Sequence, residues 1–211
     1  MKEGLYAFWK PKGVSSNGFL NQLRREIGIK KMGHTGTLDP LAEGVLVVGI
    51  GKGTKLIAGE SGAEKEYIAV VRLGVTSETD DEEGKKTEML VTRAIGEEEV
   101  LQELSSFKGI IKQIPPVYSA IKIQGQEAYK LVRAGKAPIM QAREAEIKEI
   151  AMLSYEWPFV SFRIVTGPGV YIRAIARDLG EKLKVGGHLA SLQRIRVGHY
   201  TKDDIIDNKK L

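Results

Sequence analysis

A glycine-rich stretch at residues 31–46 places the strongest constraint on how this chain folds. It reads KMGHTGTLDPLAEGVL and continues into the apolar residues Val47 and Val48. Glycine allows backbone angles that are closed to other residues, and Pro40 restricts both its own φ and the conformation of the preceding Asp39. We therefore expect a stiff loop that leads into a buried strand and presents one carboxylate, that of Asp39.

The chemistry of this loop centres on Asp39. It is the only acidic residue between Glu26 and Glu43, and the basic residues Lys31 and His34 precede it. A lone carboxylate in a basic setting stays ionised, as a nucleophile or a general base must. An Asp-Pro pair is also common at turns and helix starts, so the dipeptide alone leaves a purely structural role open.

Composition excludes several classes of protein. With 211 residues, 42% of them hydrophobic, the chain can bury a substantial core in one large domain or two small ones. It has no cysteine and only three histidines, which argues against disulfides, Cys-based zinc sites and a structural metal. Because no long apolar run and no signal peptide are present, we expect a cytoplasmic protein without membrane segments.

The charge distribution suggests an anionic partner. The formal net charge is +5 and the isoelectric point is about 9.2. Basic residues gather near the amino terminus: Lys10, Lys12, Arg24, Arg25, Lys30 and Lys31. Such a basic flank beside the Asp39 loop suits phosphate groups, although a solvated surface would carry the same charges.

A second glycine-rich segment, residues 49–55 (GIGKGTK), superficially resembles a nucleotide-binding loop. A P-loop requires Ser or Thr directly after Gly-Lys, whereas Gly53 follows Lys52, and the dinucleotide fingerprint requires a third glycine where Thr54 stands. Both templates fail. We read the segment as a strand-to-helix turn in which Lys52 and Lys55 are expected to meet the anionic partner.

Hydrophobic periodicity predicts an α+β protein. Helices are expected from Ser15 or Ser16 to Gly28, over residues 97–107 with Leu101 on the inner side, and from residue 171 onward. Strands are expected at residues 5–9, 45–50, 65–74, 144–154 and 157–166, the last two forming a hairpin around Tyr155-Glu156. Residues 77–84 (SETDDEEG) are expected to form an exposed acidic loop.

The loop at residues 33–46 resembles the signature of the TruB family of pseudouridine synthases, in its bacterial tRNA form. Further motifs of this family are matched by Lys-Pro-x-Gly at residues 10–13, Lys-x-Tyr at residues 65–67 and Gly-x-Tyr-Ile-Arg at residues 169–173. A closing motif lies at residues 187–196, where Gln193 replaces the usual first arginine of Leu-Arg-Arg. The resemblance covers residues 5 to 200.

This resemblance implies a pseudouridine synthase fold, with a mixed, mainly antiparallel central sheet flanked by helices and loops. It implies that the chain isomerises uridine to pseudouridine at position 55, in the T loop of tRNA, after flipping the base out of its stack. The reaction requires neither cofactor nor metal. The implied partner is the T-arm stem-loop of tRNA, bound by a monomer without a protein partner.

Site residues follow from the matched motifs. Asp39 is the implied catalytic carboxylate, and Arg173 is its partner, which orients it and keeps it ionised. Tyr67 is expected to stack on the target base and to take the proton from carbon 5. Leu192 is expected to line the uracil pocket, and three roles remain open for Asp39: addition to the sugar, addition to the base, or removal of a ribose proton.

Two further residues are expected to bind the nucleotide: His34, wedged into the space that the base leaves, and Tyr171, which helps to seat it. RNA backbone contacts are expected from Lys10, Lys12, Lys31, Lys52, Lys130 and Arg133. The last two lie in a segment at about residues 112–140 that resembles the RNA-gripping insertion of the family.

Many family members continue into a carboxy-terminal PUA domain, whereas this sequence ends at Leu211. We therefore expect a single catalytic domain over residues 1–211 that grips tRNA more weakly. Two alternatives stay open: a non-catalytic RNA-binding protein that uses the same cleft, and a synthase that acts on another RNA.

Overall fold

The structure, a computed structural model, describes residues 2–206, which form two compact units. Within the described residues, the first unit comprises residues 2–68, 163–168 and 191–206, and the second comprises residues 69–162 and 169–190. Three strands contribute residues to both units: β4 (Lys65–Leu73), β11 (Phe159–Thr166) and β12 (Gly187–Val197). Every helix in the described part of the chain is too short or too polar to cross a bilayer.

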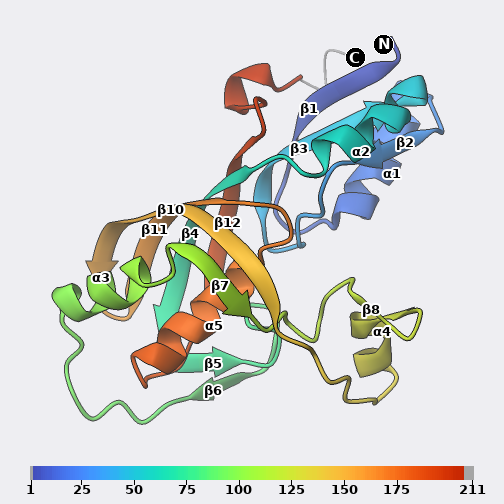
Figure 1. Ribbon diagram of the computed structural model, residues 1–211. Helices are drawn as coiled ribbons and strands as arrows, with labels where there is room; N and C mark the ends of the chain where they lie inside the picture. The colour runs from blue at the N-terminus through green and yellow to red at the C-terminus, as the bar shows by residue number, and fades with distance from the viewer. Residues whose placement is uncertain (1, 207–211) are drawn as a thin grey trace. The chain divides into compact units, whose positions relative to one another are not determined.

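The first unit is built on strands and one amphipathic helix (Figure 1). Its own elements are β1 (Gly4–Lys10), α1 (Ser16–Ile27), β2 (Met32–His34), β3 (Glu43–Ile50), α2 (Ile57–Glu60) and the 3₁₀ helices η1 (Gly51–Leu56) and η2 (Lys202–Asp204). Strand β3 pairs antiparallel with β1 and β2 and parallel with β12. Side chains alternate along β3, so Leu46 and Val48 face α1 and Val45 and Val47 face the other side.

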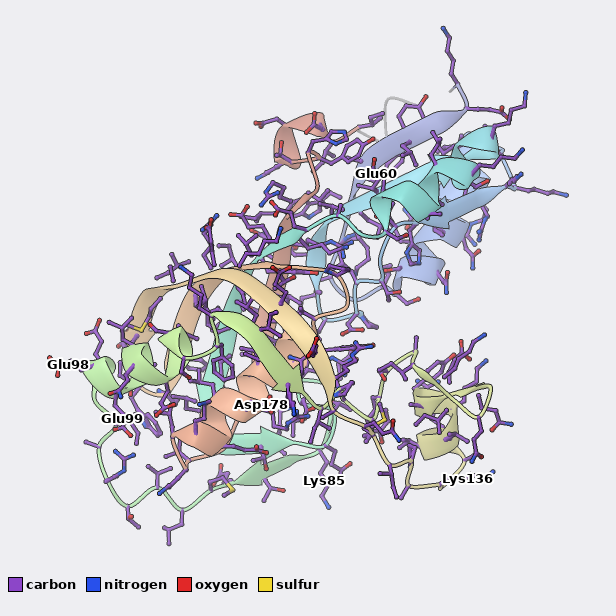
Figure 2. All side chains as sticks on the ribbon, viewed as in Figure 1. Glu60, Lys85, Glu98, Glu99, Lys136 and Asp178 are labelled. Carbon is purple, nitrogen blue, oxygen red and sulfur yellow. The ribbon has the colours of Figure 1, made fainter. Side chains whose placement is uncertain are left out.

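The second unit carries the other half of the sheet. Its elements are β5 (Val75–Ser77), β6 (Lys86–Glu88), α3 (Glu97–Ser105), β7 (Gly109–Gln113), β8 (Lys122–Ile123), β9 (Gln126–Glu127), α4 (Ala128–Arg133), β10 (Arg143–Glu156) and α5 (Ile172–Lys182). Helix α3 packs against β10 and α5. Figure 2 shows Glu98 on α3 pointing away from this unit.

The hydrogen-bonded strand order is β1-β3-β12-β4-β11-β10-β7, with β2 beside β3, and two short hairpins lie outside it. The pairs β1–β3, β2–β3 and β10–β7 are antiparallel and β12–β3 is parallel. The predicted α+β class with a mixed, mainly antiparallel sheet is therefore confirmed.

Helix α1 begins and ends where the sequence predicts. Ser15, not Ser16, caps it, because the Ser15 hydroxyl accepts a hydrogen bond from the Gly18 amide at 3.0 Å. Gly28 ends the helix in the left-handed region, with φ of 75°. The apolar stripe of Phe19, Leu20 and Leu23 is buried, as the 3.6-residue period requires.

Two predicted details are wrong. Leu101 of α3 is 45% exposed, because the buried stripe of this helix consists of Val100 and Leu104 alone. The turn of the β10–β11 hairpin lies at Trp157-Pro158, since β10 extends through Glu156. Proline ends the strand at that point because it has no amide hydrogen to donate.

Candidate active site

The backbone on both sides of Asp39 is held by the segment that opens α1. The Ser16 hydroxyl donates to the Leu38 carbonyl at 2.9 Å and accepts from the Leu38 amide at 2.8 Å. The Gly13 amide donates to the Pro40 carbonyl at 2.7 Å, and the Asp39 carbonyl accepts from the Ala42 amide at 3.1 Å. The loop is therefore fixed by hydrogen bonds immediately before and immediately after the carboxylate.

Arg194 of β12 anchors the same loop from the sheet. This side chain is only 1% exposed. Its Nε donates to the Val45 carbonyl at 2.8 Å, while Nη2 and Nη1 reach the carbonyls of Gly36 and Thr37 at 3.1 and 3.5 Å. One guanidinium thus ties the start of β3 to the residues that lead to Asp39.

The same guanidinium interacts with two predicted catalytic residues. Its charge interacts electrostatically with Tyr67 and with Asp39. Burial lowers the pKa of Arg194, whereas the interactions with Tyr67 and Asp39 act in the opposite direction. Within the first unit, the buried charge of Arg194 therefore acts on both Asp39 and Tyr67.

Gly44 allows β12 to approach closely enough for this arrangement. It lies opposite Arg194 in the β3–β12 register and has φ of +124°. A Cβ atom at this position would stand 2.2 Å from the Arg194 carbonyl oxygen. The glycine is consequently required both by the backbone angle and by the space between the strands.

Tyr67, Leu192 and His34 belong to the same unit as this cation. Tyr67 is 7% exposed on β4, and Leu192 is 8% exposed on β12, where the two-residue period places it on the same face as Arg194. His34 ends β2, and burial followed by the charge of Arg194 lowers its pKa. Lys65, two residues before Tyr67, has a lowered pKa for the same two reasons in the same order.

Arg173 lies in the second unit, in the first turn of α5. It is 5% exposed, and its Nη1 and Nη2 donate to the carbonyls of Thr79 and Tyr118 at 3.0 and 2.9 Å. The Asp81 carboxylate lies 3.6 Å from Nη1. Asp81 is itself 2% exposed, so the pair forms a buried ionic contact.

The prediction that residues 77–84 form an exposed acidic loop is therefore wrong in part. Asp81 is buried against Arg173, and the Asp80 carboxylate accepts from Arg177 at 2.8 Å. Glu82 Oε1 lies 2.9 Å from Nε2 of the buried His188. From sequence alone, a run of acidic residues is expected to be exposed to solvent. Here the acidic residues have partners about a hundred residues away along the chain: arginines of α5 and a histidine of β12.

Tyr171 is held in place by two side chains of the second unit. Gln113 is fully buried; its amide nitrogen donates to the Tyr171 carbonyl at 3.1 Å and its oxygen accepts from the Tyr171 amide at 2.9 Å. The guanidinium of Arg143 stands 4.9 Å from the centre of the Tyr171 ring, within cation–π range. These contacts fix both the backbone and the ring of the residue predicted to seat the nucleotide.

Lys10 does not fit its predicted contact with RNA backbone. It is fully buried, and its Nζ donates to the carbonyls of Pro11 and Val14 at 2.9 and 2.7 Å. Its ammonium group therefore braces the turn after β1, and we remove it from the expected RNA contacts. Sequence alone could not separate the two uses, since both require a lysine beside a Pro/Gly turn.

The other predicted RNA-contacting residues are exposed: Lys12, Lys31, Lys52, Lys130 and Arg133. Lys130 pairs with Glu127 at 2.5 Å, and Lys52 lies 3.9 Å from Glu3. The hairpin β8–β9 and helix α4 project from the rest of the second unit (Figure 1), and Lys136 follows α4 on the same excursion (Figure 2).

The atypical Gln193 has a partner of its own. Its amide donates to the Glu43 carboxylate at 2.9 Å, and the two residues lie opposite each other in the β3–β12 register. The sequence reasoning identified this departure and the pocket leucine but overlooked Arg194. The sequence did contain the information needed to identify Arg194, because side chains alternate along a strand and residues 192 and 194 therefore lie on the same face.

Comparison with known proteins agrees with this architecture. Residues 24–172 match the family model of the TruB family pseudouridylate synthase N-terminal domain. Residues 173–211 match the model of the tRNA pseudouridylate synthase B C-terminal domain. A solved structure of a Cbf5–Nop10–Gar1 complex superposes with a TM-score of 0.75 and 28% identity; it covers 96% of this chain, which spans only 51% of that one.

Two relatives carry the name tRNA pseudouridine synthase B. The protein from Thermobifida fusca (strain YX) is 41% identical, over 95% of this chain and 71% of the relative. That from Clostridium novyi (strain NT) is 40% identical, over 99% of this chain and 72% of the relative. Fold and sequence define a pseudouridylate synthase, an isomerase. The chain belongs to the TruB family.

Proposed function

We propose that this protein converts the uridine at position 55, in the T loop of tRNA, into pseudouridine. Membership of the TruB family supports the reaction, and the names of relatives at 40–41% identity support tRNA as the substrate. The observation that carries the proposal is the loop that presents Asp39, which hydrogen bonds from Ser16 and from the buried Arg194 hold in place. The protein acts as a cytoplasmic monomer on the T arm.

Binding begins with extrusion of the target uridine, because its glycosidic bond and carbon 5 are out of reach inside a stack. Extrusion costs a few kilocalories per mole, and less from a loop than from a duplex. His34 fills the vacated space, Tyr67 and Leu192 hold the two faces of the ring, and Tyr171 seats the nucleotide. Lowering of the His34 pKa by burial and by Arg194 suits this role, since a neutral imidazole is cheaper to insert between bases.

The chemical step exchanges one bond for another. The bond between nitrogen 1 and the ribose carbon breaks, the uracil turns, and a bond from carbon 5 to the same ribose carbon forms. Asp39 initiates this exchange. Tyr67 takes the proton that carbon 5 loses as its own hydroxyl proton leaves, and nitrogen 1, freed from the ribose, gains a proton. Product and substrate are isomers, so the overall reaction needs no external oxidant or reductant.

The test is release of tritium from a T-arm hairpin labelled at carbon 5 of uridine 55. Wild-type protein is expected to release the label, and D39N, which removes the charge but keeps the size, is expected to lower the rate by at least about a thousandfold. The control D203N alters an exposed acid of η2 and should keep the wild-type rate.

Three results would contradict the proposal. Undiminished release by D39N would remove Asp39 from the mechanism. Tight hairpin binding by the wild type without release would make the protein an RNA binder rather than an isomerase of this substrate. Release from a labelled uridine elsewhere in the hairpin, but not from position 55, would redirect the activity to another site.

A further inference from the structure

The burial of Arg194 calls for an explanation beyond packing. Its guanidinium is almost fully buried, and three of its N–H groups donate to the main-chain carbonyls of Gly36, Thr37 and Val45. Taking a charged side chain out of water is costly, and well-packed apolar residues often replace buried charges without loss of stability. A methionine would fill similar space, so the charge and the five fixed donors need a further reason.

The donor geometry supplies that reason. A guanidinium has donors only, and those of Arg194 are directed at carbonyls of the Asp39 loop and of the start of β3. At the same time, Arg194 holds the carbonyls of Gly36 and Thr37, which lie three and two residues before Asp39. One rigid planar group thus fixes the backbone that presents the predicted catalytic Asp39.

We infer that Arg194 is a positioning residue of the isomerisation, which holds the Asp39 loop against the start of β3 through its charge and its donors. The inference rests on the proposed function. It is independent of Arg173, because all the contacts that carry it lie within the first unit.

The test uses two substitutions of Arg194 and a matched control. R194K keeps a positive charge but loses the planar fork, and R194M removes the charge at similar volume. R196K makes the same exchange two residues further along β12, at a side chain that pairs with Glu64 and Glu66. Each variant is checked for folding by thermal unfolding, and isomerisation is measured in single turnovers with saturating labelled hairpin.

R194M is expected to lower the single-turnover rate constant by about 10- to 100-fold, as misplacement by an ångström can do, while hairpin affinity changes little. R196K should retain the wild-type rate within about twofold, because its ionic partners are Glu64 and Glu66 rather than the Asp39 loop. A fall in rate at saturating RNA separates a loss of positioning from a loss of binding.

The R194K variant allows a second measurement, the pH dependence of the rate. A purely steric role of Arg194 would not change this dependence. Burial lowers the pKa of a lysine, so Lys at this position is charged at low pH and neutral at high pH, whereas Arg stays charged throughout. The rate of R194K, relative to the wild type, should therefore fall as pH rises. The groups that face position 194 are His34 of β2, Asp39 of the loop, and Lys65 and Tyr67 of β4, and they are common to both proteins.

The outcomes separate the two proposals. Wild-type protein that releases no tritium overturns the proposed function. Active wild type with R194M at the wild-type rate overturns the inference, as does an R194K rate that follows the wild-type pH profile at a constant ratio. If neither variant folds, Arg194 serves stability, and the positioning role is abandoned.

Discussion

At the scale of single residues, Gly44 lies between two buried cations. It pairs with Lys10 across the antiparallel β1–β3 ladder and with Arg194 across the parallel β3–β12 ladder. Both cations direct their donors at main-chain carbonyls of turns that flank the Asp39 loop or precede α1. Buried polar donors that meet carbonyls fix backbone geometry, because leaving either side without its partner is costly.

Glu66 makes a partly buried ionic contact, with a predictable dependence on pH. Burial acts to raise its pKa, but hydrogen bonds and charges from Arg196 and Arg163 outweigh it and hold the pKa below the ordinary 4.5. The folded state therefore binds this proton less readily than the unfolded state. The resulting stability is present above pH 4.5 and is lost as pH falls through the lowered value.

E66Q is expected to lower the free energy of unfolding at pH 7 by about 1–3 kcal/mol, since two charge-assisted hydrogen bonds are weakened. The difference from the wild type should shrink as the pH falls below about 4. Urea unfolding at several pH values measures both effects. The control E64Q, at a side chain that is 33% exposed, should cost less than about 1 kcal/mol; equal losses for both would contradict the burial argument.

At the scale of elements, two adjacent serines at the start of helix α1 have different structural roles. Ser15 is exposed and caps the helix, whereas Ser16 is buried and bonds both backbone groups of Leu38. The two hydroxyls are chemically identical, and only the helical rotation between them decides which one reaches the loop. Helix α1 therefore serves as the support on which the Asp39 loop is mounted.

S16A is expected to reduce single-turnover isomerisation by about tenfold or more, because the Leu38 amide and carbonyl lose their partner beside Asp39. It should also cost about 1–3 kcal/mol of stability. S15A is the matched control: losing a helix cap costs about 1 kcal/mol, without an effect on the rate constant. Equal rates for S15A and S16A would show that the loop is held by other contacts.

At the scale of the whole molecule, net charge and the projecting excursion at β8, β9 and α4 bear on RNA binding. The chain carries a formal charge of +5, and the excursion presents Lys130 and Arg133 on its exposed side. Contacts between such side chains and phosphates release counterions, so affinity falls with salt concentration in proportion to their number.

The double variant K130A/R133A is expected to weaken hairpin binding, and to lower the slope of log affinity against log salt by about one unit for each phosphate contact that is lost. Titration of labelled hairpin at several salt concentrations measures both quantities. The single-turnover rate at saturating RNA should remain within about twofold of the wild type. An unchanged slope would show that these two residues face solvent rather than RNA.

The sequence by itself determined the family, the α+β class and the strongly patterned elements, such as α1 with its serine cap and glycine end. These features depend on local periodicity and on glycine and proline, whose backbone preferences act within a few residues. Only tertiary structure decided the burial of Lys10, the partners of Asp81 and Glu82, and the position of Arg194 against the loop. The sequence does not distinguish a charged side chain that is exposed to solvent from one that is buried, because strands and helices that are distant along the chain set its environment.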